Sequence, residues 1–257
     1  MARWTDFAPD SHFGFDRKAV KKQWPRLHAR DQEALPDDAA LLDAWVLFHN
    51  GQFQEARRIG MELGDAGNTV AHKATCVYAA QMERRETEKL ALYQWVSERA
   101  AAQALREPGN PNAHYLLAYS LGRYSQGISV AQALAQGMGS RIKSALETTI
   151  ALQPLHADAH FALGAFHAEI IDKVGALIGG MAYGARKDAS LQMFEQGLAL
   201  QPQSPGGLVE YAIALVMLEG EIQQDKAEAL CGQAAALKPL DAQEYLDIAR
   251  AKAGLGA

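Results

Sequence analysis

The chain has 257 residues and a formal net charge of -5, with 49% hydrophobic and 21% charged residues. This composition is typical of a globular protein that buries a sizeable core, and it excludes a disordered chain. The acidic balance argues against a general nucleic-acid partner, because such binders carry a basic excess or a concentrated basic face. No stretch approaches about 18 uninterrupted apolar residues, so the sequence predicts no membrane span.

The cellular compartment is indicated by the cysteines and by the start of the chain. Cys76 and Cys231 lie far apart and form neither a disulfide framework nor a metal-binding C-x-x-C pair. Residues 1–22 have no continuous apolar core of the kind that a signal peptide needs. We therefore expect a cytoplasmic protein.

Residues 1–36 form a segment rich in aromatic and charged side chains, ahead of the solenoid predicted over residues 37–257. Its basic residues between Arg17 and Arg30 are interleaved with acidic ones such as Asp31, which favours a solvated helix face. Its aromatic residues, which could cover a groove on the rest of the molecule, are Trp4, Phe7, Phe13, Phe15 and Trp24. The sequence leaves open whether they do so.

Helical signals dominate the rest of the chain. Ala, Leu, Gln and Glu recur at spacings of three and four residues, whereas strand signals are nearly absent. Four segments end alike, each as an apolar helix tail stopped by a proline: ALREP at 104–108, IALQP at 150–154, LALQP at 198–202 and AALKP at 235–239. Proline cannot continue a helix and restricts the residue before it, so a helix break is predicted near each of these prolines.

The intervals between these prolines carry a repeated pair of helices. A helix, a turn, a second helix and a proline exit make up the tetratricopeptide pattern W-x2-L-G-x2-Y…A-x3-F…P. In the repeat over 160–202, the pattern positions are held by His160, Leu163, Gly164, His167, Ser190, Phe194 and Pro202. Similar matches cover 114–154 and 208–239, an earlier repeat shows near Asn50, and a degenerate one is predicted over about 68–106.

Since one helix pair cannot bury its apolar face alone, at least three must stack. The sequence therefore predicts an all-α fold, a right-handed helical solenoid of the tetratricopeptide type. The helix pairs of the middle repeats are predicted to be extended.

Residues of about 70–250 resemble the regulator-of-microtubule-dynamics family of helical-repeat proteins and its bacterial relatives. The stretches that carry the resemblance are 112–115, 150–154, 160–164 and 191–195. The resemblance implies the repeat fold and a scaffold-like role, but not a microtubule partner, because fold does not fix function. A weaker similarity links the chain to repeat-containing lipoproteins that partner bacterial transport proteins, although their lipid-attachment cysteine is not found near its start.

Histidines are the first candidates for chemistry, because His156, His160 and His167 lie close together in the sequence. His156 is expected in a turn, and the other two occupy positions that packed aromatic residues normally fill. No G-x-S-x-G, S-x-x-K or H-E-x-x-H motif occurs, and no glycine-rich stretch includes the Gly-Lys-Ser/Thr of a phosphate loop. We therefore expect no catalytic residue, no metal and no cofactor, and hence a protein that is not an enzyme.

A binding groove is predicted on the concave surface, which the first helix of each pair lines in this kind of solenoid. Exposed aromatic and polar side chains there suit a peptide or another ligand. The predicted groove residues are Trp45, Phe48, Asn112, Tyr115, Tyr119, Arg123, Phe161, Glu169, Ile213 and Met217.

The two middle repeats carry similar apolar inserts between their helices, at 133–138 and 176–181. The apolar spacing predicts that the first helix of the second repeat runs on until Gly179-Gly180 breaks it. The inserts are predicted to pack side by side as an apolar ridge for self-association or partner binding. Its predicted residues are Leu134, Met138, Val174, Leu177 and Met181.

These observations predict a non-catalytic binding or scaffold protein whose concave groove holds a protein or peptide partner of unknown identity. The alternative is a small-molecule or lipid-binding protein with a cavity walled by the apolar inserts. An apolar tunnel would favour the alternative, whereas an open groove that ends in charged residues would favour the first. A homo-oligomer is possible in either case.

Overall fold

The computed structural model describes residues 4–9 and 13–255, and every regular element within them is a helix. Helix α1 (Arg17–Leu27) is followed by a series of helix pairs and by α14 (Ala242–Gly254). The pairs are α2 (Ala39–His49) with α3 (Phe53–Glu62), α4 (Asn68–Gln81) with α5 (Glu86–Arg106), α6 (Pro111–Gln126) with α8 (Met138–Leu152), α9 (Ala157–Val174) with α11 (Lys187–Leu200), and α12 (Pro205–Glu219) with α13 (Gln224–Ala236). Short helices α7 (Val130–Ala135) and α10 (Ala176–Tyr183) and the 3-10 turns η1 (Gly64–Gly67) and η2 (Gly220–Gln223) lie between them.

The helices begin and end where the sequence provides the stop signals. The helices before Pro108, Pro154, Pro202 and Pro239 all end within three residues of the proline, which confirms the predicted breaks. Side chains cap the starts of α6, α12 and α14, because Asn110, Ser204 and Asp241 each accept a backbone N–H of the first turn. The predicted all-α stack of helix pairs is thus confirmed over the described residues, including the degenerate pair at α4 and α5.

Small residues let the two helices of a pair approach closely. A Cβ atom added to Gly164 of α9 would lie 2.8 Å from the Phe194 ring of α11 and 3.1 Å from the Ser190 carbonyl oxygen. Ser190 Oγ also donates a hydrogen bond of 2.7 Å to the Gly164 carbonyl oxygen. The pattern positions assigned to Gly164, Ser190 and Phe194 therefore meet in space.

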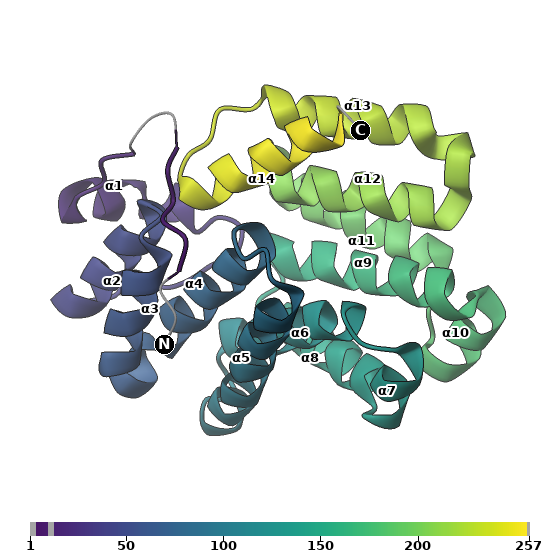
Figure 1. Ribbon diagram of the computed structural model, residues 1–257, viewed down its shortest axis with the longest axis horizontal. Coiled ribbons are helices and arrows are strands. Elements are labelled where there is room, and N and C mark those ends of the chain that lie inside the picture. Colours follow the sequence, from purple (N-terminus) through teal and green to yellow (C-terminus); the bar gives the residue numbers. More distant parts are fainter. Residues whose placement is uncertain (1–3, 10–12, 256–257) are drawn as a thin grey trace.

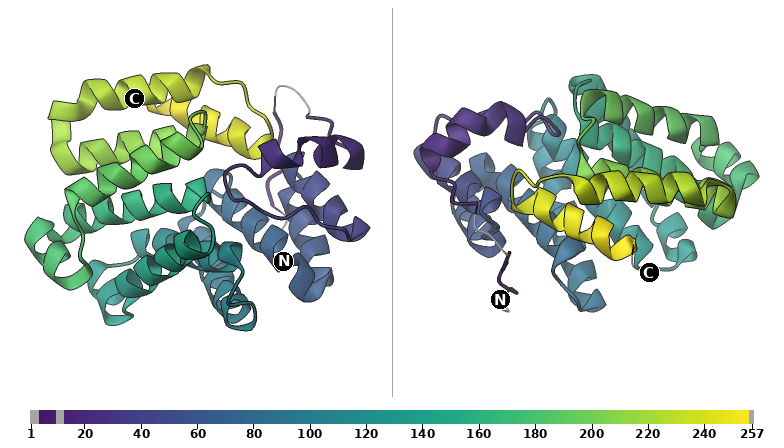
Figure 2. Two further views of the ribbon diagram at one scale, coloured as in Figure 1. Left: turned by 180° about the vertical axis from the view of Figure 1, so that it is seen from behind. Right: turned by 90° about the horizontal axis from the view of Figure 1, so that it is seen from above.

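The stack curves until its two ends touch. Figure 1 shows α14 beside the N-terminal helices, and Figure 2 shows the same closure from behind and from above. Ala242 of α14 belongs to the N-terminal core, and the Tyr245 ring packs edge-on against Phe7 and Phe13. The solenoid therefore closes on itself around its concave face.

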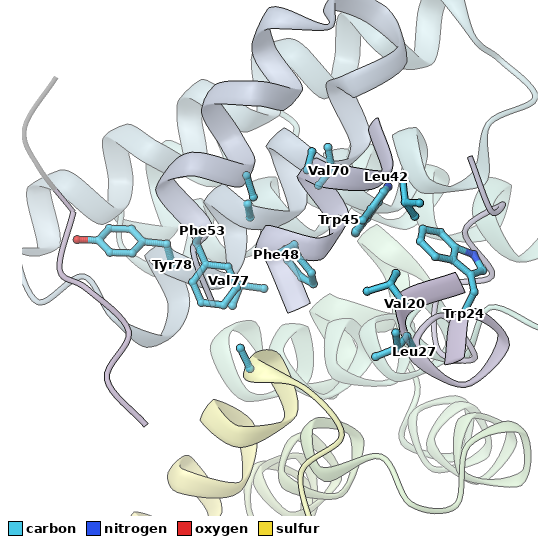
Figure 3. Close-up of a cluster of buried hydrophobic side chains, with 14 of the residues drawn as sticks. Val20, Trp24, Leu27, Leu42, Trp45, Phe48, Phe53, Val70, Val77 and Tyr78 are labelled. Atoms are coloured by element: carbon cyan, nitrogen blue, oxygen red, sulfur yellow. The ribbon is translucent and has the colours of Figure 1, made fainter. Parts of the chain in front are cut away.

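The N-terminal segment packs into the first repeats (Figure 3). The Trp4 ring stacks on Tyr78 with centroids 4.0 Å apart, and Trp24 of α1 meets Trp45 of α2 edge-on at 5.8 Å. The aromatic residues of the segment therefore cover the N-terminal pairs and not the middle repeats. The domain boundary between residues 1–36 and 37–257 stays a prediction.

The inserts differ from the prediction in one respect. Helix α9 runs on to Val174, as expected for an extended pair, but Gly175 and not Gly179-Gly180 breaks it. Gly175 has a φ of 81°, in the region that favours glycine, and Gly179 and Gly180 lie inside the separate helix α10. No helix in residues 4–9 and 13–255 combines the length and the hydropathy that crossing a membrane requires.

Replacing Gly164 with leucine tests the pairing of α9 with α11. We expect Gly164→Leu to lower the free energy of unfolding by about 1–3 kcal/mol, because the new side chain overpacks the contact with Phe194. Urea denaturation followed by circular dichroism measures the change. Gly232→Leu on α13 is the control, since a Cβ there meets nothing within 4 Å. Equal losses in both variants would contradict the assigned packing.

Candidate functional site

The concave face holds a cleft with a volume of about 450 Å³. Its walls come mainly from the first helices of the pairs, α4, α6, α9 and α12, with α5, α7, α8, α10 and α14 completing them. The lining mixes charged, aromatic and aliphatic side chains. The cleft therefore offers both polar and apolar contacts to a bound molecule.

One group of charges lies between the first turn of α9 and the middle of α14. Arg30 Nε donates to both carboxylate oxygens of Asp158, at 3.0 and 2.9 Å, and Arg30 Nη1 lies 3.4 Å from Asp247 Oδ2. Burial opposes the charge on Arg30, but the two carboxylates outweigh it and hold the pKa of Arg30 well above its usual value. Burial raises the pKa of Asp247 to about 6 although Arg30 lowers it. This group has one cation for two acids.

A second group has the opposite balance. Glu210 Oε1 of α12 accepts hydrogen bonds of 2.7 Å from Arg123 of α6 and from Arg250 of α14. Burial would raise the pKa of Glu210, but the two guanidinium groups outweigh it and lower this pKa to about 2. Together the two groups contain three arginines and three acidic residues. When all three acids are ionised, the groups therefore add no net charge to the cleft.

Tyrosines supply the neutral hydrogen-bonding groups of the cleft. Tyr93, Tyr115 and Tyr119 line it, and burial raises the pKa of each hydroxyl, so all three stay protonated at neutral pH. The Tyr115 and Tyr119 rings lie 6.0 Å apart, and the Arg123 guanidinium stands 5.2 Å from the Tyr119 centroid. Such rings present flat apolar surface together with a hydroxyl that can donate to a peptide carbonyl.

Residues 28–33, here called the strap, cross one end of the cleft. The Arg30 carbonyl oxygen accepts the Asp158 backbone N–H at 3.1 Å. Asn112 Nδ2 donates to the Asp31 carbonyl oxygen at 3.2 Å and to Glu33 Oε2 at 2.6 Å. The strap is therefore fixed to the first turns of α6 and α9 by its backbone as well as by its side chains.

A buried chain of polar contacts fixes the other side of the strap. Asp31 accepts from Lys73 of α4 and lies 2.9 Å from His28 Nδ1. His28 Nε2 lies 3.3 Å from His49 Nε2, and His49 Nδ1 lies 2.8 Å from Asp241 Oδ2. Burial lowers the pKa of His28 to about 4, although Asp31 raises it, so His28 is neutral at neutral pH. This chain joins the strap to α2, α4 and the first turn of α14.

Half of the predicted groove residues line the cleft. They are Tyr115, Tyr119, Arg123, Phe161 and Glu169. Phe161 is largely buried, because its ring sits where Cβ atoms on Gly197 and Gly207 would come within 2.5 Å of it. Glu169 accepts from Gln126, and burial raises its pKa. Their role in binding stays a prediction.

The other half lie elsewhere, which corrects the predicted groove. Trp45 and Phe48 are buried in the N-terminal core, because α1 covers α2. Asn112 is buried beneath the strap that it binds. Ile213 and Met217 are half-buried against the C-terminal core and do not line the cleft, because α14 packs across α12.

The histidines take up structural contacts. Nε2 of His114 and Nε2 of His160 each lie 3.0 Å from a proline carbonyl oxygen six residues earlier, so one contact recurs in two repeats. His156 caps α9, with its Nδ1 accepting from the Ala159 N–H at 3.1 Å. His167 is buried. Among the residues that the structure describes, no cluster of three or more His, Cys, Asp or Glu could hold a metal ion.

Sequence reasoning missed several residues of the cleft: Arg30, Tyr93, Glu210, Asp247 and Arg250. Arg30 was expected on a solvated face and is instead half-buried, with only 13% of its side chain exposed. Tyr93 lies on the second helix of the degenerate repeat, where no pattern position marks it. The sequence could have indicated Glu210 as a cleft residue, because it is the one acidic residue in the otherwise apolar run 208–218.

The predicted insert ridge is formed only in part. Leu134, Leu177 and Met181 are exposed, as a binding surface requires, whereas Met138 is buried in the core and Val174 is half-buried beside the cleft. Met138 is buried because it is the first residue of α8, which packs against α6. Self-association or partner binding through the exposed residues stays a prediction.

Stacked helix pairs around a concave cleft define a helical-repeat solenoid of the tetratricopeptide type. Among solved structures, the chain is similar to TTC0263, a thermophilic tetratricopeptide-repeat protein in Thermus thermophilus, with a TM-score of 0.58. The two share 16% sequence identity, and the similarity covers 83% of this chain and 97% of that one. At this identity the similarity shows the fold alone. No protein-family model and no curated protein matches the chain.

Removing the charge of Arg30 tests whether the strap depends on it. We expect Arg30→Met to lower the free energy of unfolding by about 3–5 kcal/mol, because it leaves two buried carboxylates without their cation. Arg58→Met is the control, since Arg58 pairs with Glu55 and Glu62 on the exposed face of α3 and should contribute only about 0–1 kcal/mol. Chemical denaturation of both variants provides the comparison, and a loss for Arg30→Met no larger than the control's would contradict the assignment.

His156 makes the stability depend on pH. Burial lowers its pKa to about 4, below the ordinary value of 6.5, so the unfolded chain binds a proton there more readily than the folded one. Its contribution is therefore fully present above pH 6.5 and is lost as the pH falls toward 4, by about 1 kcal/mol per pH unit.

His156→Asn removes this titration and keeps a capping side chain, as Asn110 does for α6. We expect the wild type to lose more stability than this variant between pH 6.5 and 4.5. Urea denaturation at a series of pH values measures the difference. Parallel pH profiles for the two proteins would show that His156 does not titrate in this range.

Proposed function

We propose that the protein is a non-catalytic binding or scaffold protein that holds a segment of a partner protein in its cleft. The observation that supports this best is the cleft itself, which runs along the first helices of consecutive pairs and is lined by Tyr93, Tyr115 and Tyr119. Protonated hydroxyls beside flat rings suit a peptide, whose backbone needs hydrogen bonds and whose side chains need apolar surface. Because the charges around Arg30 and around Glu210 pair with one another, the partner segment need not carry a charge to match these two groups.

A small-molecule or lipid ligand is the second candidate. The cleft volume falls within the range of about 300–1,000 Å³ that ligand pockets occupy. Val130 and Leu134 of α7, with Tyr183 of α10, wall one part of it, as that alternative requires. Mass spectrometry of an organic extract of the purified protein separates the two, since a stoichiometric small molecule would favour this candidate.

The finer expectations from the sequence remain part of the proposal. They are a kinship with the regulator-of-microtubule-dynamics family and its bacterial relatives, a cytoplasmic location, no nucleic-acid partner, and no catalytic activity or cofactor. The tetratricopeptide fold of a solved neighbour supports a protein partner without identifying it.

Gly122 offers a direct test of the cleft. It lies in the cleft on α6, and a Cβ atom there meets nothing within 4 Å, so a photo-crosslinking amino acid fits at this position. We expect it to crosslink a partner from native extract, identified by mass spectrometry. The same amino acid at Gly232 on α13, which also has open space and does not line the cleft, is the control.

Filling the cleft should then block the captured partner. Gly122→Trp places a large ring in the open space, so we expect at least about a tenfold loss of affinity, of the size that loss of a binding hot spot produces. Gly232→Trp should bind as the wild type does. Unchanged binding by Gly122→Trp would exclude the cleft as the partner site.

A further inference from the structure

Two buried imidazole rings face each other where the strap meets α2. Nε2 of His28, in the strap, lies 3.3 Å from Nε2 of His49, the last residue of α2. The two residues are 2% and 1% exposed. The rings of Trp24, Trp45 and Phe48 pack against them (Figure 3), so the contact is shielded from solvent.

The other nitrogen of each ring meets a carboxylate. His28 Nδ1 lies 2.9 Å from Asp31 Oδ1, and His49 Nδ1 lies 2.8 Å from Asp241 Oδ2. Burial would raise the pKa of both carboxyl groups, but their cationic and hydrogen-bonding partners outweigh it and hold each pKa below its usual value. Both groups are therefore ionised at neutral pH. Since an ionised carboxylate only accepts hydrogen bonds, each Nδ1 must carry a hydrogen and donate it.

This assignment determines the state of the two Nε2 atoms. A neutral imidazole has one hydrogen, so a ring that carries it on Nδ1 has an acceptor at Nε2. Two neutral rings would turn two lone pairs toward each other in a buried site, which leaves both polar atoms without a donor. One added proton removes this conflict, because one Nε2 then donates to the other. Two added protons would restore a conflict, between two donors.

The charges of the buried chain favour the same count of one proton. Lys73 supplies one positive charge, and Asp31 and Asp241 supply two negative charges. One proton on the imidazole pair makes the sum zero, whereas its absence leaves a negative charge uncompensated in the interior. Burial lowers the pKa of His28 to about 4, although Asp31 raises it, so the proton lies on His49.

We propose that His28 and His49 hold a single proton between them, and that this proton completes the closure of the solenoid. His49 Nε2 donates to His28 Nε2 in the strap, and His49 Nδ1 donates to Asp241, the N-cap of α14. Removal of the proton at alkaline pH loosens α14 from the strap and from α2. This device acts in the same way whichever ligand the cleft takes.

Ionisable groups on the neighbouring elements act on this proton. Glu33 and Glu244 lie in the same environment as Asp31 and Asp241, and burial raises the pKa of each to about 7. Each of them gains a negative charge as the pH rises through 7, which helps to retain the proton. The full set consists of Glu33 and Arg30 of the strap, Lys73 of α4, His156 of α9 and Glu244 of α14.

A metal ion is the other species that accepts two imidazole lone pairs. A divalent ion would bring two positive charges where the buried chain lacks one. Zinc also takes four ligands in structural sites, whereas the described residues contain no group of three or more His, Cys, Asp or Glu that could hold a metal ion. The charge balance and the ligand count therefore favour the proton.

Nitrogen NMR of the full chain with isotope-labelled histidine counts the proton directly. At pH 7.5 we expect one ring of the pair to be an imidazolium, with both nitrogens protonated. The other ring should be neutral, with its hydrogen on Nδ1. The signals are assigned by their loss in His28→Gln and in His49→Gln. The wild-type spectrum is decisive even where a variant does not fold.

Asp241→Asn removes the need for the proton and keeps the shape of the site. The amide oxygen still accepts the Glu244 N–H that caps α14, and the amide nitrogen replaces Oδ2 and donates to His49 Nδ1. His49 Nε2 then donates to His28 Nε2 without an added proton, and the buried charges again sum to zero. We therefore expect no imidazolium at this pair in the variant.

Proton release on unfolding provides a second count. A histidine of an unfolded chain is deprotonated at pH 8, where Glu33 and Glu244 are mostly ionised in either state. We expect the wild type to release about one proton more per chain than Asp241→Asn when urea unfolds it at this pH. Asp38→Asn is the matched control, because it changes the exposed N-cap of α2 and should release protons as the wild type does.

Amide hydrogen exchange tests the link to closure. At the pH where the imidazolium signal of the wild type disappears, exchange in α14 should accelerate at least about tenfold relative to α12. The comparison with α12 cancels the effect of pH on the chemical exchange rate. Asp241→Asn should show no such change, since it closes the polar chain without the proton.

Several outcomes would overturn the proposal. Two neutral rings, or two imidazolium rings, in the wild type at pH 7.5 would contradict the shared proton. Equal proton release by the wild type and Asp241→Asn would do the same. An unchanged exchange ratio of α14 to α12 would contradict its role in closure. Stoichiometric metal in elemental analysis of untagged protein would assign the two nitrogens to a metal ion instead.

Discussion

The buried carboxylate of Asp31 is the constraint on which the rest of the structure depends. A charge removed from water must find partners, and Asp31 finds them in Lys73 and in His28. Burial would raise the pKa of Asp31, yet these partners hold it well below its usual value. The strap that carries Asp31 is consequently fixed in place. This positions the neighbouring Arg30 so that it pairs with Asp158 and Asp247.

The same constraint shapes the cleft. A repeat solenoid is normally stabilised between neighbours only, so its two ends are independent of one another. Here the strap joins α4, α6, α9 and α14, and the ends are held together across the concave face. Charged groups at the centre of the concave face therefore add to the apolar contacts of Ala242 and Tyr245 that close the solenoid.

The fold could be predicted because it is encoded locally. The prolines that end helices, and the small and large residues at Gly164 and Phe194, act over one helix pair. The candidate site could be predicted only in part. Tyr115, Tyr119 and Arg123 could be predicted as cleft residues, because their spacing along the first helix of a pair places them on the concave face. Closure of the solenoid could not be predicted, because it depends on contacts such as Arg30 with Asp247 that join distant parts of the sequence.

Two of the errors have causes other than this closure. Trp45 was expected to be exposed because a solenoid leaves its first helices open on the concave side, but α1 covers it. The helix break at Gly175 was missed for a different reason. Apolar spacing continues through it, and only the φ angle distinguishes that glycine from Gly179.

The contact between Arg30 and Asp247 also has a consequence for biosynthesis. The two residues are separated by 217 positions in the chain. At about 5–20 residues per second, a ribosome needs about 10–40 seconds to add that length, and longer before the last helix leaves the exit tunnel. During that time the strap lacks one of its carboxylate partners, and the apolar edge that α14 will cover is open to water. The first repeats of this protein are therefore synthesised early, but their packing is completed only when α14 has been made.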